Sequence, residues 1–293
     1  MRFKDLSAAK HQRPIFSRNR KVYGPRGSRT ALKMTSYLAY GGGGLDQIDP
    51  FDARDANLWR KAEYLGRYLF AADFLREHRT NLVADISCGR GYGAAELAGV
   101  AGRVVGVDGS PSMIESARKS FKRDNLAFLC RDLNEAELFS DIEEGSAAAV
   151  VSFETLEHLL DPSRALSQFS RILQPGGFFI ASVPHVLSES GDSSGLPRNK
   201  SHKQWFSYGS LSRLVQKSDM DMVYRLGQSW SRALFRREQQ LCNARRLGSR
   251  LSDEPLMHTP EMIRWLSYVA AYPTVEDVDG SYSIIIVARK KSV

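Results

Sequence analysis

The stretch VADISCGRGYGAAEL, residues 83–97, carries the strongest indication of fold in the chain. Apolar residues run up to Asp85, then Gly89, Gly91 and Gly93 follow in close succession, and helix-forming residues resume. Glycine lets the backbone turn sharply and lets a ligand lie against main-chain atoms. The first turn of a helix has free N–H groups. The pattern therefore predicts a buried strand, a ligand-binding turn and a helix.

On both sides of this turn, short apolar segments alternate with segments of helical periodicity. Strands are expected at residues 81–86, 103–108, 126–130, 147–153, 177–183, 221–227 and 282–289. Helices are expected at 58–78, 92–99, 111–123, 162–173 and 208–218. This alternation predicts an α/β fold with parallel βαβ units, a doubly wound sheet and helices on both faces.

Asp85 indicates the charge of the ligand. In a doubly wound sheet, ligands lie at the carboxyl ends of the strands, where Asp85 is expected. A dinucleotide fingerprint has its third glycine three positions after the second, whereas Gly93 comes two after Gly91. A carboxylate would also repel a pyrophosphate but attract the sulfonium and ammonium groups of S-adenosylmethionine. An NAD-dependent oxidoreductase is therefore disfavoured.

Two further acids follow the next two strands. Asp108 lies 23 positions after Asp85, close to the offset at which an acid accepts hydrogen bonds from ribose hydroxyls. Ser110 and Pro111 already supply the helix start, so Asp108 is not needed as a cap. Asp132 could accept from an adenine amino group, with the Leu133 N–H near the ring. A surface loop acid is an equally good interpretation of Asp132.

These segments resemble the motifs of class I S-adenosylmethionine-dependent methyltransferases. The matching stretches, in order, are VADISCGRGYG, VVGVDGSPSMIESARK, FLCRDLNE, AAAVVSFETLEHLLDP and RILQPGGFFIASVP. SFETLEHL, SHKQWFSYGSLSRLV and the Gly227–Gln228 pair look like the ubiquinone-biosynthesis-type branch (methyltransferase type 11/23). The resemblance implies a Rossmann-like, seven-stranded, mostly parallel sheet with an antiparallel last strand. It implies S-adenosylmethionine as cofactor, held by Asp85, Ser87, Gly89, Gly91, Asp108, Gly109, Met113, Asp132, Leu133, Phe153 and Glu154.

The sequence departs from the family pattern in three ways. Ser87 and Cys88 stand where a glycine and a cysteine are common, and His185 stands where asparagine is frequent. Residues 229–281 form a long insertion between the last two strands, expected to be helical and to cover the cofactor's methyl group as a lid. Trp265 and Tyr268 are expected on the core-facing side of its second helix.

The arginines of the insertion have two interpretations: a solvated helix face, or a surface for an acidic acceptor such as a phosphorylated or nucleotide-linked sugar. They are Arg232, Arg236, Arg237, Arg245 and Arg246. The resemblance favours methyl transfer to a hydroxyl of a sugar, glycan precursor or natural product. N-methyl transfer and a non-catalytic, cofactor-binding partner module are the alternatives.

Histidines near the ends of the fourth and fifth strands are the candidate catalytic bases. A histidine has the pKa suited to accepting a proton near neutrality, and a base accelerates transfer to a hydroxyl by about 10²–10⁴-fold. We rank His202 and His158 together, ahead of His185. Glu154 and Glu157 are expected to contact the cofactor or to shape the loop. The sequence shows no metal-ligand cluster, so no metal is assigned.

Composition limits the cellular context. Residues 1–33 contain ten basic residues and one acid, whereas the whole chain has a net charge of +8. Residues 1–45 are therefore expected to be a solvated basic arm, and 46–293 the methyltransferase domain. Contact with a phosphate-rich partner or anionic membrane, or a transit peptide, are alternatives for the arm. Nucleic-acid binding is not indicated.

Cysteine usage and hydropathy point to the cytoplasm. The three cysteines lie far apart and no pair has metal-ligand spacing, which fits a reducing compartment. The apolar runs are too short to span a membrane, and the first ten residues show no secretory signal. A homodimer remains a possible oligomeric state.

Overall fold

The computed structural model describes residues 48–292 except 53–54, 135–138, 140–141, 190–198 and 276–280. These residues belong to one compact unit, Leu45–Val293. The basic arm expected over residues 1–45 lies outside the described residues. No helix in the described part of the chain combines the length and hydrophobicity that a membrane span requires.

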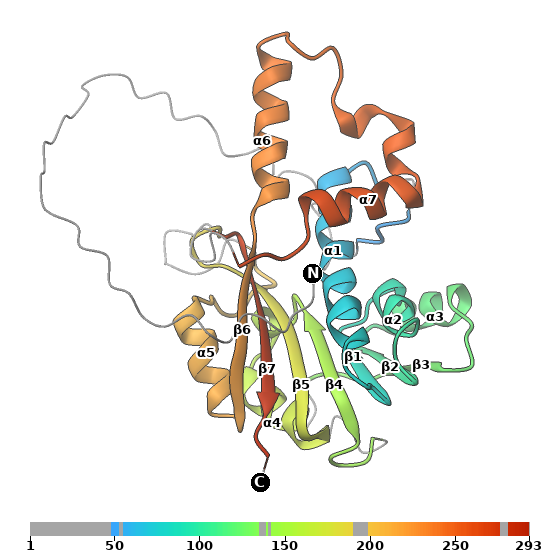
Figure 1. The fold of residues 1–293 in the computed structure, drawn as a ribbon, viewed down its shortest axis with the longest axis vertical. Coiled ribbons are helices and arrows are strands. Elements are labelled where there is room, and N and C mark those ends of the chain that lie inside the picture. The colour runs from blue at the N-terminus through green and yellow to red at the C-terminus, as the bar shows by residue number, and fades with distance from the viewer. Residues whose placement is uncertain are drawn as a thin grey trace, which may run out of the picture. The chain divides into compact units, whose positions relative to one another are not determined.

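One seven-stranded sheet forms the centre of this unit (Figure 1). Its order is β3-β2-β1-β4-β5-β7-β6. Neighbours from β3 to β5 pair in parallel, whereas β7 runs antiparallel to both β5 and β6. The strands are β1 Leu82–Ile86, β2 Arg103–Asp108, β3 Leu126–Cys130, β4 Ala147–Phe153, β5 Leu173–Pro184, β6 Met220–Gln228 and β7 Ser283–Lys290. The predicted fold class is confirmed.

Helices cover both faces of the sheet because its central strands are apolar on both sides. β4 is buried throughout. Alternate residues of β1 point to opposite faces of the sheet: Val83 packs in the core on one face, whereas Ala84 and Ile86 pack in the core on the other. One core includes α1 Leu58–Arg76, α2 Tyr92–Leu97 and α3 Pro111–Ser120. The other includes α4 Pro162–Ile172 and α5 Tyr208–Gln216.

The insertion packs on α1 and forms a third core with it. Its elements are α6 Trp230–Asn243, η3 Leu251–Asp253, η4 Pro255–His258 and α7 Pro260–Ala270. Ile263, Leu266 and Ala270 of α7 face Leu65 and Leu69 of α1 in this core. In Figure 1, α7 lies across α1. A close approach explains Gly66: a Cβ there would stand 2.5 Å from the carbonyl oxygen of Ala271.

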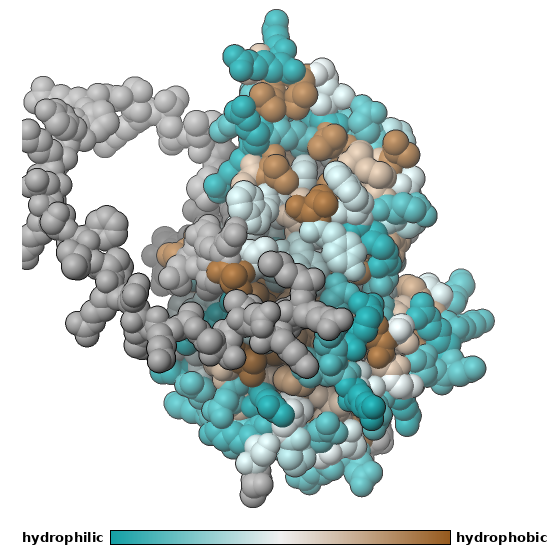
Figure 2. All heavy atoms as spheres, viewed as in Figure 1, coloured by the Kyte–Doolittle hydropathy of each residue, from teal (hydrophilic) through white to brown (hydrophobic). Residues whose placement is uncertain are grey.

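The prediction that Trp265 and Tyr268 face the core is wrong. Trp265 is 54% exposed and Tyr268 45% exposed, because Ile263 and Leu266 set the buried side of α7. Figure 2 shows hydrophobic side chains scattered among hydrophilic ones over this end of the molecule. Arg236 and Arg237 are exposed on α6, as a solvated helix face requires, and so are Arg245 and Arg246 beyond it. The Arg232 side chain lies outside the described atoms.

Candidate active site

Asp85, at the end of β1, is a fully buried carboxylate. Its Oδ1 accepts a hydrogen bond of 3.1 Å from the Tyr68 hydroxyl. Its Oδ2 has no hydrogen-bond partner among the described residues. Burial raises the pKa of Asp85 to about 8; the Tyr68 hydrogen bond opposes this shift and the charge of Asp108 adds to it. A half-satisfied acid in a buried position invites a cationic ligand.

The turn after β1 takes left-handed backbone angles at three positions. Ser87 has φ 61°, Gly89 φ 54° and Gly91 φ 84°. A Cβ at Gly91 would also stand 2.7 Å from the ring of Phe128. The Gly89 position has no atom within 4 Å of such a Cβ, so it borders open space. The predicted glycine turn is therefore present, with an open side where a ligand could lie against the main chain.

Gly93 serves a different purpose from the other two glycines. A Cβ at this position would stand 2.1 Å from the Tyr68 ring. The absence of a side chain lets Tyr68 lie on α2 and reach Asp85. The ring also makes edge contacts with Tyr92 and Phe153, with centroids 5.3 and 4.9 Å apart. Sequence analysis missed Tyr68, because it belongs to a helix ahead of the methyltransferase motifs.

Asp108 holds the glycine turn to the start of α3. Its Oδ2 accepts from the Gly89 N–H and its Oδ1 from the Ser110 N–H, each at 2.9 Å. A carboxylate has about four lone-pair sites, so both oxygens retain acceptor capacity for ribose hydroxyls. Ser110 begins α3 without a side-chain cap. α3 begins at Ser110 and Pro111 as predicted, so Asp108 connects the glycine turn to the residue before the helix and does not cap the helix itself.

Of the remaining predicted cofactor residues, Met113 lies in α3, whereas Gly109, Asp132, Leu133 and Phe153 lie at or just beyond the ends of β2, β3 and β4. Asp132 is exposed, and its Oδ1 accepts from the backbone and side-chain amides of Asn134. Gly109 is exposed as well. The other three are buried apolar residues: Met113, Leu133 and Phe153. The surface-acid interpretation of Asp132 agrees with this geometry, although its second oxygen remains a possible acceptor.

Glu154 ends β4 in a left-handed conformation, with φ 49°. Its Oε1 lies 3.3 Å from Nη1 of the buried Arg67 and accepts a 2.8 Å hydrogen bond from the Ser182 hydroxyl. Arg67 also donates to Gln228 and Ser283, each at 3.0 Å. Arg67 of α1 thus connects β4 with the ends of β6 and β7. This engagement leaves Glu154 less available to a cofactor than the sequence predicted.

Arg67 was not predicted either, although its spacing from Glu63 indicates a buried contact. Glu63 and Arg67 are four residues apart and therefore share a helix face, separate from the apolar stripe of α1. Both are buried. Two opposite charges four residues apart on one face of a largely buried helix indicate a polar contact in the interior.

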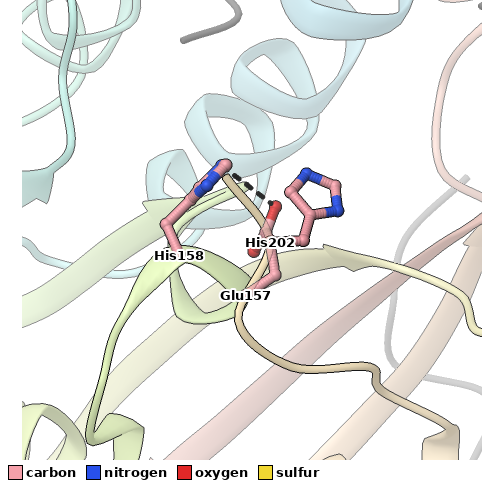
Figure 3. A group of neighbouring side chains, drawn as sticks. All are labelled: Glu157, His158 and His202. Carbon is pink, nitrogen blue, oxygen red and sulfur yellow. Dashed lines mark ion pairs between the residues drawn. The ribbon is translucent and has the colours of Figure 1, made fainter. Parts of the chain in front are cut away.

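Figure 3 shows that His158, His202 and Glu157 come together near the carboxyl ends of β4 and β5. His158 and Glu157 belong to η2 Leu156–His158, whereas His202 belongs to the loop before α5. The two imidazole rings meet edge to face with centroids 4.9 Å apart. Glu157 is 1% exposed, and burial raises its pKa well above the ordinary value. No spacing in the sequence predicts this cluster, because His202 comes from a separate loop.

His185 does not join this cluster. It is 4% exposed, and its Nδ1 accepts a 3.2 Å hydrogen bond from the Leu187 N–H. Its own N–H donates to the Tyr282 carbonyl oxygen at 2.8 Å. His185 therefore shapes the loop after β5, and the structure separates it from the other two candidate bases.

Comparisons with known proteins agree with this geometry. A family model for a methyltransferase domain matches residues 84–181. A probable S-adenosylmethionine-dependent methyltransferase of Mycolicibacterium smegmatis is 32% identical over 145 residues, 50% of this chain and 54% of that protein. A ubiquinone biosynthesis O-methyltransferase of Alkalilimnicola ehrlichii is 32% identical over 101 residues, 34% of this chain and 40% of that protein. The chain thus spans about half the length, or less, of these curated relatives.

Solved structures share the fold at low sequence identity. An S-adenosylmethionine-dependent methyltransferase from Mesorhizobium loti superposes with a TM-score of 0.50 at 17% identity, over 78% of this chain and 98% of that one. A chain from the complex of the Haloferax volcanii Trm112 methyltransferase activator with a methyltransferase gives 0.51 at 19% identity, over 80% and 98%. At these identities the likeness concerns the fold alone.

The sheet order, the acid at the end of β1 and the matched domain define a class I methyltransferase fold. Residues 84–181 match a methyltransferase domain, the chain is similar to S-adenosylmethionine-dependent methyltransferases of this class, and S-adenosylmethionine is the cofactor of those proteins. The described residues fit a cationic cofactor, because Asp85 presents a buried, unpartnered carboxylate oxygen beside an open glycine turn.

Proposed function

We propose that this chain binds S-adenosylmethionine at the β1 turn and transfers its methyl group to a small-molecule acceptor, most favourably to a hydroxyl. The observation that carries the proposal is the buried Asp85 carboxylate, with one oxygen on Tyr68 and the other without a hydrogen-bond partner among the described residues. A cationic ligand would supply a positive counter-charge and so stabilise the ionised form of this buried acid.

Each part of the turn has a distinct role in binding. Asp85 attracts the positive groups of the cofactor, the Gly89–Gly91 turn lets it lie against the backbone, and Asp108 accepts from its ribose hydroxyls. Asp132 and Leu133 are the proposed contacts for the adenine ring. The bound cofactor supplies a methyl group already activated on a sulfonium, so orientation of the acceptor provides most of the remaining acceleration.

The acceptor side is the edge formed by η2 and the loop before α5. His158 and His202 are the residues there that act on the acceptor's proton, because both are partly exposed and lie together. His185 ranks below them because it is buried and its Nδ1 accepts from Leu187. Transfer would break the acceptor O–H bond and the S–CH₃ bond, form an O–CH₃ bond, and release the proton to water through this edge with S-adenosylhomocysteine as the leaving group.

O-methyl transfer is favoured over N-methyl transfer by the likeness to ubiquinone biosynthesis O-methyltransferases. A sugar, glycan precursor or natural product is the proposed acceptor class. The exposed arginines in and after α6 would suit an acidic acceptor, although a solvated face explains them equally well. Cytoplasmic location and a possible homodimer remain proposals.

Two measurements test the function in sequence. Calorimetry with S-adenosylmethionine should show one binding site, weakened at least about tenfold in Asp85→Asn because the attraction of the charge is lost. A matched control, Asp124→Asn, removes an exposed acid and should bind as wild type. An acceptor screen by mass spectrometry then follows the added mass of one methyl group. Binding without any methylated product would favour the non-catalytic partner module.

A further inference from the structure

The strongest unexplained feature of the acceptor edge is a set of convergent ligand atoms. Glu157, His158 and His202 each place one ligand atom within 4.8 Å of the other two. His158 Nε2 lies 3.8 Å from Glu157 Oε1 (Figure 3). Zinc-type ions hold nitrogen and oxygen ligands at about 2.0–2.2 Å. Side-chain rotations would therefore be enough to bring these atoms around one ion.

Both imidazoles are oriented with Nδ1 on an oxygen acceptor. His158 Nδ1 lies 3.2 Å from the Ser201 carbonyl oxygen, and His202 Nδ1 contacts the Glu189 carboxylate. An oxygen partner fixes the proton on Nδ1 and leaves Nε2 as the lone pair that a metal would take. Carboxylate and carbonyl partners of this kind orient metal-bound histidines in known sites. The exposed Asn199 amide, 2.9 Å from His202 Nε2, would have to give way.

Glu157 supplies the independent observation. It is 99% buried, and neither of its carboxylate oxygens has a hydrogen-bond partner among the described residues. The nearby Glu154 is itself an acid, and it forms the ion pair with Arg67. Buried charges in proteins are paired or coordinate metals. Glu157 therefore offers two buried carboxylate oxygens to which a bound cation would be a partner.

We propose that Glu157, His158 and His202 bind one divalent transition-metal ion of the zinc class, with Glu189 orienting His202 from outside. Two nitrogens and one carboxylate suit Zn²⁺ or Co²⁺ rather than Mg²⁺ or Ca²⁺, which prefer all-oxygen sites. Three protein ligands leave a coordination position open, as in catalytic zinc sites. Resting on the proposed function, the ion would hold the acceptor hydroxyl there and lower its pKa. His158 and His202 would then act on the acceptor's proton through the ion and not as free bases, and the proton would be lost to water.

The test uses the full chain without an affinity tag, stripped with a chelator and titrated with Co²⁺. We expect visible Co²⁺ absorption bands that saturate at one equivalent and are displaced by Zn²⁺. His158→Asn and His202→Asn should each weaken binding at least about tenfold, and Glu189→Gln about 10–100-fold as an outer-shell change. His78→Asn, a histidine at the far end of α1, should bind as wild type.

A second variant guards against loss of folding in the histidine variants. Glu157→Gln replaces a buried carboxyl that has no hydrogen-bond partner among the described residues with a neutral amide of the same shape, so the metal-free variant should be at least as stable as wild type. It should nevertheless lose the Zn²⁺-dependent rise in melting temperature that ligand binding gives the wild type. Absent Co²⁺ bands, or bands unchanged in His158→Asn and His202→Asn, would overturn the metal site.

The readouts separate this inference from the proposed function. S-adenosylmethionine binding is measured on the stripped chain and should persist in all four variants. Co²⁺ bands with no methyl transfer to any acceptor would keep the metal site and reject the proposed function. Methyl transfer that proceeds in metal-stripped protein, with no Co²⁺ bands, would keep the proposed function and reject the metal site.

Discussion

The Tyr68 hydroxyl donates a 3.1 Å hydrogen bond to Oδ1 of Asp85 and thereby ties α1 to the end of β1. Both residues are buried, and the bond lowers the pKa of Asp85 against the larger effect of burial. The helix that precedes the methyltransferase motifs therefore lowers the pKa of the acid at the proposed cofactor turn, against the larger effect of burial.

Tyr68→Phe should raise the pKa of Asp85 further, because it removes a hydrogen bond that favours the charged form. The pH at which S-adenosylmethionine affinity reaches half its maximum should move upward, and the free energy of unfolding should fall by about 1 kcal/mol. Calorimetry across pH and thermal denaturation measure the two effects. Tyr92→Phe, in the ring beside Tyr68, is the matched control and should leave the pH midpoint unchanged.

Cofactor affinity in the wild type should rise with pH as Asp85 loses its proton. With a pKa of about 8 in the empty chain, Asp85 is mostly neutral below that pH. A cationic ligand must then expel the proton, so affinity should fall by up to about tenfold per unit below pH 8. The cofactor's own ammonium loses its charge near pH 8 as well. Asp85→Asn isolates the protein's share: a slope as steep as wild type in this variant would refute the assignment.

The same pKa has a consequence for the stability of the empty chain. The unfolded state ionises Asp85 near its ordinary value of 3.8, whereas the folded state holds the proton up to about pH 8. The folded form therefore binds more protons in this window, and its contribution to stability is lost as pH rises from about 4 to about 8. Thermal melting should show a smaller decline over this range in Asp85→Asn than in wild type.

Gly93→Ala should destabilise the chain by about 1–3 kcal/mol through overpacking, because the added methyl would overlap the Tyr68 ring. Cofactor affinity should fall with it, since Tyr68 must shift away from Asp85. Gly209→Ala is the matched control: a Cβ there has no atom closer than 3.5 Å. The second change Tyr68→Ala should recover part of the packing loss; an additive double variant would contradict this explanation.

Arg67→Met should cost about 3–5 kcal/mol of unfolding free energy, because it leaves Glu154 without its buried cation. Chemical denaturation measures the loss. Arg76→Met removes an exposed partner of Asp73 in the same helix and should cost about 1 kcal/mol or less. Adding Glu154→Gln to Arg67→Met should recover much of the stability. If Arg67→Met lowers the free energy of unfolding no more than Arg76→Met does, the ion pair between Arg67 and Glu154 does not stabilise the fold.

His158→Ala and His202→Ala should retain cofactor binding on the metal-stripped chain, whereas at least one should lose turnover on the true acceptor by about 10²-fold or more. His185→Ala changes a buried loop residue, so it should lower the free energy of unfolding more than it lowers the rate of methyl transfer. Calorimetry and product mass spectrometry distinguish these effects. Full activity of both His158→Ala and His202→Ala would exclude them from handling the acceptor's proton.

The sequence by itself determined the strands, the glycine turn and the class of protein. Hydrophobic periodicity and turn residues are local properties of the sequence. For this reason six of the seven strands begin and end within a residue of their predicted ranges: β1, β2, β3, β4, β6 and β7. β5 begins earlier, at Leu173, and α6 and α7 cover only Trp230–Asn243 and Pro260–Ala270 of the insertion that was expected to be helical. Asp85 was found because it belongs to the strand and turn that carry the pattern.

Only the tertiary structure decided what those residues touch. Tyr68 meets Asp85 across 17 positions, Arg67 meets Gln228 across 161, and His202 meets His158 from a separate loop. Such contacts depend on how α1 and the loops close over the sheet, and side-chain periodicity carries no information about that closure. The same reason explains why Trp265 and Tyr268 were misplaced: the packing of α7 against α1 selects its buried face, and hydrophobicity alone does not.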